Sequence, residues 1–86
     1  MKLHVYADPG HAWVKVSKKN KHFEEVARLI TSYSYTRGDY VYLEEDFDAP
    51  TFLNHLWRKG IEFSFKAHRT DRRSRIRSYD NYYSER

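Results

Sequence analysis

Basic side chains gather in two segments of the sequence. Four lysines lie between positions 15 and 21, and five arginines lie between positions 69 and 77. Ammonium and guanidinium groups bind phosphates and carboxylates, and the guanidinium fork suits phosphate especially well. Aromatic residues, which stack on unpaired bases and concentrate at protein interfaces, make up 17% of the chain. These residue types predict binding of an acidic or polyanionic partner.

A catalytic interpretation rests on the acidic stretch at residues 44–48. Its four carboxylates could hold Mg²⁺, as in a metal-dependent nuclease. We favour a structural alternative, because negative charge stabilises the start of a helix and Asp48 is a candidate N-cap.

The histidines form no motif that predicts catalysis. The five of them contain no i, i+4 pair of the kind that binds zinc on a helix, and the chain has no cysteine. His4 and His11 could form an acid–base pair across a hairpin, but no nucleophile motif accompanies them. We therefore expect a protein that is not an enzyme, with no cofactor and no metal site.

Length and composition restrict the class further. With 86 residues, the chain has room for one hydrophobic core. The absence of cysteine favours a reducing compartment, and no apolar run approaches the length needed to span a bilayer. We expect a cytoplasmic protein without membrane association, as a monomer or a homodimer.

The first elements that must position these residues are a hairpin and a helix. Residues 3–7 and 12–16 alternate between apolar and polar, and Asp8-Pro9-Gly10 is typical of the turn between two strands. This alternation places Leu3, Val5, Ala12, Val14 and Val16 on one face and His4, Tyr6, Trp13 and Lys15 on the other. The spacing of Phe23, Val26, Ala27 and Ile30 then predicts a helix that begins after Asn20.

The second half of the chain repeats this pattern. Residues 33–35 and 40–43 predict another hairpin, with Gly38 in the left-handed conformation. A helix follows from Asp48, with its apolar stripe on Ala49, Phe52, Leu53 and Leu56, and ends at Gly60. Alternation over residues 61–66 predicts a strand with Ile61, Phe63 and Phe65 inward.

These elements predict an α+β fold. The order ββαββαβ favours a two-layer sandwich, in which both helices cover one face of an antiparallel or mixed sheet. We assign residues 1–66 to a single domain and residues 67–86 to a basic, Arg- and Tyr-rich tail, which is either a mobile arm or a short docked helix.

The second face of such a sheet, free of helices, would be aromatic and basic. We expect it to form a contact surface, since exposed aromatic patches mark interfaces, although the tail could instead cover it through Ile76, Tyr79 and Tyr83. Stacking of single-stranded nucleic acid, as on an RRM sheet, is the alternative function. The predicted binding residues are Tyr6, Trp13, Lys15, Tyr40, Tyr42, Lys66, Arg69, Arg72, Arg73, Arg75 and Arg77.

Several short motifs carry a resemblance. They are Asp8-Pro9-Gly10-His11 with Trp13, Tyr33-Ser34-Tyr35 with Gly38, Tyr42-Leu43-Glu44-Glu45-Asp46, and Ile76-Arg77 with Tyr79. In these the chain resembles small uncharacterised accessory proteins encoded by bacteriophages and plasmids. The resemblance implies a role in the host bacterial cytosol: binding a host protein, a protein–nucleic-acid complex or a nucleic acid, and inhibiting a defence system of the anti-CRISPR or anti-restriction type. The basic charge argues against DNA mimicry.

Overall fold

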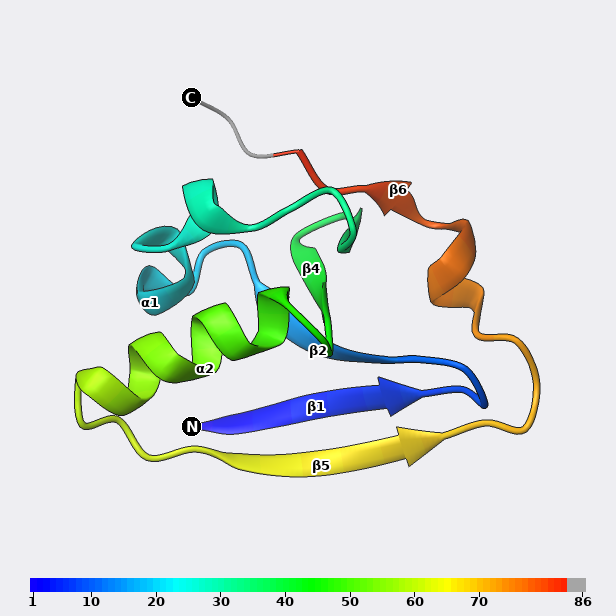
Figure 1. Cartoon of the computed structure of the whole chain (residues 1–86), viewed down its shortest axis with the longest axis horizontal. Coiled ribbons are helices and arrows are strands. Elements are labelled where there is room, and N and C mark those ends of the chain that lie inside the picture. Colours follow the sequence, from blue (N-terminus) through cyan, green and yellow to red (C-terminus); the bar gives the residue numbers. More distant parts are fainter. Residues whose placement is uncertain (84–86) are drawn as a thin grey trace.

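Six strands form one mixed sheet in the order β5-β1-β2-β4-β3-β6, with the helices packed against it (Figure 1). The structure is a computed structural model and describes residues 1–83, so positions 84–86 of the predicted tail lie outside the described residues. Neighbouring strands are antiparallel except β1 and β5, which run parallel. The predicted α+β class is confirmed. In chain order the elements are β1 (Lys2–Ala7), β2 (Ala12–Ser17), α1 (Lys21–Glu24), η1 (Ala27–Leu29), β3 (Tyr35–Arg37), β4 (Tyr40–Glu44), α2 (Asp48–Arg58), β5 (Ser64–Arg69), η2 (Arg75–Ser78) and β6 (Asp80–Asn81).

Both predicted hairpins are present. β1 pairs with β2 and β3 pairs with β4, each across a tight turn. Gly38 has φ 57° in the second turn, as predicted, a conformation that glycine adopts without steric cost. Because side chains alternate along a strand, each hairpin presents one set of residues to the helices and another to the opposite face.

The helices cover the first of these faces. Phe23 from α1 meets Phe52 from α2 edge to face, with 6.2 Å between ring centroids. α1 ends after one turn, because Val26 leaves the helical conformation (φ −120°, ψ 5°) and the chain tightens into η1. The predicted stripe nevertheless faces inward, with Val26 and Ile30 buried. This first core contains Leu3, Val14, Val16, Phe23, Val26, Ile30, Val41, Leu43, Ala49, Phe52, Leu56 and Tyr82.

The strand predicted at residues 61–66 lies further along the chain, at Ser64–Arg69. Ile61 and Phe63 pack against the first core from the loop before it. Phe65 was expected inward but is 51% exposed, because β5 is the edge strand of the sheet. The domain boundary drawn after residue 66 falls inside this strand.

Residues 70–79, here called the covering segment, lie against the second face of the sheet, whereas Tyr82 beyond them packs in the first core. Ile76 from η2 packs with Trp13 and Tyr42 in a second core, which Tyr6, Tyr35 and Tyr79 extend. The expectation of an uncovered second face is therefore wrong for Trp13 and Tyr42, which are 2% and 8% exposed. Among the described residues, no helix has the length and apolar character needed to cross a membrane.

Candidate binding site

A carboxylate in the first hairpin anchors the covering segment. Asp8 accepts hydrogen bonds from Arg77 Nε at 2.7 Å and Arg77 Nη2 at 2.9 Å, and from the Ser74 backbone N–H at 2.9 Å. It also accepts from the backbone N–H groups of Gly10 and His11, which form the hairpin turn. The hydrogen bond from Arg77 is the largest of the effects that hold the pKa of Asp8 well below its ordinary value.

Gly10 leaves room for the position that Arg77 occupies. A Cβ atom at that position would lie 2.8 Å from Arg77 Nη2, closer than side chains approach one another. The Arg77 guanidinium also lies 5.6 Å from the centroid of the Trp13 ring, within the range of a cation–π contact. These contacts of Arg77 with Asp8 and Trp13 thus fix η2 against the hairpin turn. A hollow opens on each side of η2.

The first hollow, here called the arginine hollow, has a volume of about 660 Å³. It gathers four cations and three tyrosines, and none of the described residues that line it carries a carboxylate. Burial raises the pKa of Tyr42, so this ring contributes a neutral hydroxyl. The lining residues are Tyr6, Lys15, Tyr42, Thr70, Arg72, Arg73, Ser74, Arg75, Ile76 and Tyr79.

The structure thus brings six of the eleven predicted binding residues to one hollow: Tyr6, Lys15, Tyr42, Arg72, Arg73 and Arg75. Tyr40 lies beside it, with Lys15 Nζ 4.1 Å from its ring centroid. The side chains of Trp13 and Arg77 line a second hollow, on the other side of η2. Lys66 and Arg69 lie on the edge strand β5. The predicted set is therefore divided among three places.

Near the arginine hollow, His4 pairs with His68 and not with His11, the partner considered from the sequence. His4 Nδ1 lies 2.9 Å from His68 Nε2, on the neighbouring strand, and the two rings stack. His68 in turn stacks on Tyr6, with 4.7 Å between centroids. The pKa of His4 is lowered. Desolvation is the largest cause, and electrostatic repulsion from His68 and Lys66 is the next. His11 does not join this pair but lies beside Trp13.

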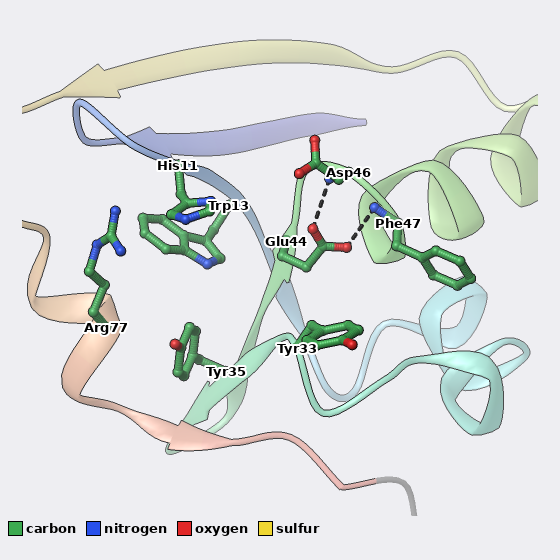
Figure 2. Close-up of a pocket in the computed structure, with 8 residues that line it drawn as sticks. All are labelled: His11, Trp13, Tyr33, Tyr35, Glu44, Asp46, Phe47 and Arg77. Atoms are coloured by element: carbon green, nitrogen blue, oxygen red, sulfur yellow. Dashed lines mark hydrogen bonds between the residues drawn. The ribbon is translucent and has the colours of Figure 1, made fainter.

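The second hollow, here called the aromatic pocket, has a volume of about 500 Å³. Figure 2 shows that the residues around it come from the first hairpin, the loop before β3 and its first residue, the end of β4 with the loop after it, and η2. Sequence reasoning missed most of this pocket and named only Trp13 and Arg77 among its lining residues as binding residues. It is lined by His11, Trp13, Tyr33, Tyr35, Glu44, Asp46, Phe47 and Arg77.

The acidic stretch at residues 44–48 divides into separate roles. Glu44 accepts hydrogen bonds from the backbone N–H groups of Asp46, Phe47 and Asp48 at 2.5–2.9 Å, so it caps the start of α2. The expectation that Asp48 is the cap is wrong, because its buried carboxylate faces away and accepts from Thr31 and Ser34. Within residues 1–83, no three histidine or acidic side chains converge in a way that could hold a metal ion.

Comparison with protein-family models, with curated proteins and with solved structures finds no significant match to this chain. The geometry of the two hollows therefore carries the functional argument.

Proposed function

We propose that this chain is a non-enzymatic accessory protein that binds an acidic surface of a host macromolecule through the arginine hollow. The observation that carries the proposal is the lining of that hollow, with Lys15, Arg72, Arg73 and Arg75 around a floor of tyrosines and no carboxylate among the described lining residues. In the setting that the resemblance implies, the partner is a protein or a protein–nucleic-acid complex of a bacterial defence system, and binding blocks it.

The chemistry of the lining supports binding to carboxylates or phosphates. Arginine forks pair with both groups through two parallel hydrogen bonds, and Arg72, Arg73 and Arg75 follow one another closely in a single segment. Tyrosine adds contact area at a low cost in conformational entropy and is enriched at binding hot spots. The anchoring of this segment by Asp8 reduces the entropy that binding would otherwise remove.

The test is affinity capture from bacterial lysate with the full chain, with and without nuclease. The double substitution Arg72→Glu/Arg73→Glu is expected to reduce capture of the partner about tenfold or more, because two charges in the hollow change sign. The matched control is Lys18→Glu/Lys19→Glu, which changes the net charge equally at exposed residues outside the hollow. Equal capture by the two double variants, or no captured partner, contradicts the proposal.

Single-stranded nucleic acid is the second candidate. The observation that favours it is the same row of arginines beside the partly exposed rings of Tyr6 and Tyr79. Burial of Trp13 and Tyr42 leaves fewer rings for stacking than an open aromatic sheet would offer, and Tyr40 already contacts Lys15. This candidate predicts a mobility shift of a labelled single strand that weakens steeply with salt, and capture that is lost on nuclease treatment.

A further inference from the structure

We infer that the aromatic pocket receives an arginine side chain of a protein partner. This inference goes beyond the proposed function, which rests on the arginine hollow alone. The two sites lie on opposite sides of η2 and carry opposite charge.

Two carboxylates give the aromatic pocket its negative charge. Glu44 is held in place by three backbone N–H groups, so its position is fixed before any ligand arrives. Asp46 is exposed and forms no side-chain hydrogen bond or ion pair with any residue in 1–83. Asp46 is thus an unpaired carboxylate next to Glu44, whose carboxylate is held in place, and two such negative charges together attract a cation.

The cation that already lines the pocket does not neutralise these groups. Arg77 is paired with Asp8 through two hydrogen bonds, so its charge is balanced outside the pocket. The pocket is therefore a locally acidic site on a chain with a net charge of +4. Charge complementarity excludes a phosphate or a carboxylate as its preferred ligand and selects a cation.

The aromatic walls narrow the choice to an organic cation. Tyr33 is 74% exposed beside Glu44 and supplies the accessible ring (Figure 2). Trp13, 2% exposed, lies edge to face with Tyr35 at 6.3 Å between centroids and forms a buried apolar floor. The faces of aromatic rings attract cations, and a planar guanidinium both stacks on a ring and pairs with a carboxylate through two hydrogen bonds. Lysine offers one charge without the planar fork, so arginine fits the pocket better.

The test is a ¹H–¹⁵N NMR titration of the full chain with the capped tripeptide Gly-Arg-Gly. The comparison ligand replaces arginine by citrulline, which has nearly the same shape and no charge. We expect saturable shifts of the Trp13 indole and the Asp46 amide with the arginine peptide, and binding about tenfold weaker with the citrulline peptide. Equal affinity for both peptides, or no saturable shift at these residues, overturns the inference.

Two substitutions locate the binding. Asp46→Asn removes the unpaired charge at constant size, and Tyr33→Ala removes an exposed ring. Each substitution is expected to weaken binding of the arginine peptide about fivefold. Asp39→Asn is the matched control, since Asp39 is an exposed carboxylate in the β3–β4 turn, outside the pocket. Equal weakening by Asp46→Asn and Asp39→Asn overturns the inference. Shifts of the pocket residues that appear on concentrating the chain without peptide would show that a second copy's arginine occupies the pocket, which overturns the assignment to a different protein.

Discussion

At the scale of single residues, Asp8 joins the first hairpin to the covering segment. Its carboxylate accepts from both Arg77 and the backbone of Ser74, residues more than 60 positions away in the chain. A carboxylate whose pKa is lower in the folded state than in the unfolded state makes stability depend on pH.

The sign of that dependence follows from the protons bound in each state. Well above the ordinary Asp pKa of 3.8, Asp8 is ionised in both states and its ion pair contributes fully to stability. As the pH falls below this value, the unfolded chain takes up the proton first, so the contribution of the ion pair is progressively lost.

We therefore expect Asp8→Asn to lower the Tm by several degrees at pH 7 and to flatten the loss of stability below pH 4. Thermal unfolding followed by near-UV circular dichroism across the pH range measures both effects. Asp39→Asn serves as control, and an Asp8→Asn variant with the wild-type acid dependence would contradict the prediction.

Residue roles that depend on neighbours along the chain could be predicted from the sequence, and those that depend on distant ones could not. Asn20 caps α1, and Gly38 adopts a positive φ, because both roles are decided within a few positions. Asp48 occupies a position where caps occur, yet its carboxylate accepts from Thr31 and Ser34, 17 and 14 residues earlier. No local pattern contains those partners.

At the scale of elements, α2 begins because Glu44 supplies acceptors from the end of β4. The first N–H groups of a helix have no partner within the helix, and Glu44 accepts from the first of these, at Asp48, as well as from Asp46 and Phe47 just before the helix. The same side chain thus joins the sheet to the helix and forms a wall of the aromatic pocket.

Glu44→Ala is expected to destabilise the fold by ~1–2 kcal/mol, as loss of a helix cap does. Urea unfolding measures the change, and Glu45→Ala, at the exposed neighbouring position, is the control. Similar midpoints for the two variants would show that Glu44 is not the cap.

The two hairpins and α2 were predictable from local patterns, whereas the early end of α1 and the placement of the edge strand β5 were not. Both hairpins follow from patterns of a few residues. β5 lies three residues beyond the predicted start, because its position is set by parallel pairing with β1, which pairs Lys2 with Ser64 and Ala7 with Arg69. Phe65 alternates like a buried residue, yet the edge leaves it half exposed.

At the scale of the whole molecule, the covering segment turns a sheet with one core into a sheet with two. Ile76 is 3% exposed between the rings of the second core. The composition predicted many surface tyrosines, but it did not show that residues 70–79 would bury part of them and leave two hollows beside η2.

Ile76→Ala is expected to cost ~2–4 kcal/mol, as large-to-small substitutions in cores do, and to loosen the covering segment from Trp13. Fluorescence in a Trp57→Phe background reports Trp13 alone, and we expect its emission to shift toward the red as water reaches the ring. Leu29→Ala, at a residue 54% exposed on η1, is the control in the same background. An unchanged Trp13 emission in Ile76→Ala would contradict the role given to the second core.

The parallel pairing of β1 and β5 also bears on how this chain folds during synthesis. The Met1 amino group donates to the Glu62 carbonyl oxygen, and the Ser64 backbone N–H donates to the Met1 carbonyl oxygen. During synthesis, β1 therefore keeps one edge without its β5 partner until residues more than 60 positions later have been made. Contacts so distant in sequence slow folding, and an open strand edge invites pairing with other chains. While β5 is still missing, the open edge of β1 thus favours aggregation of the growing chain.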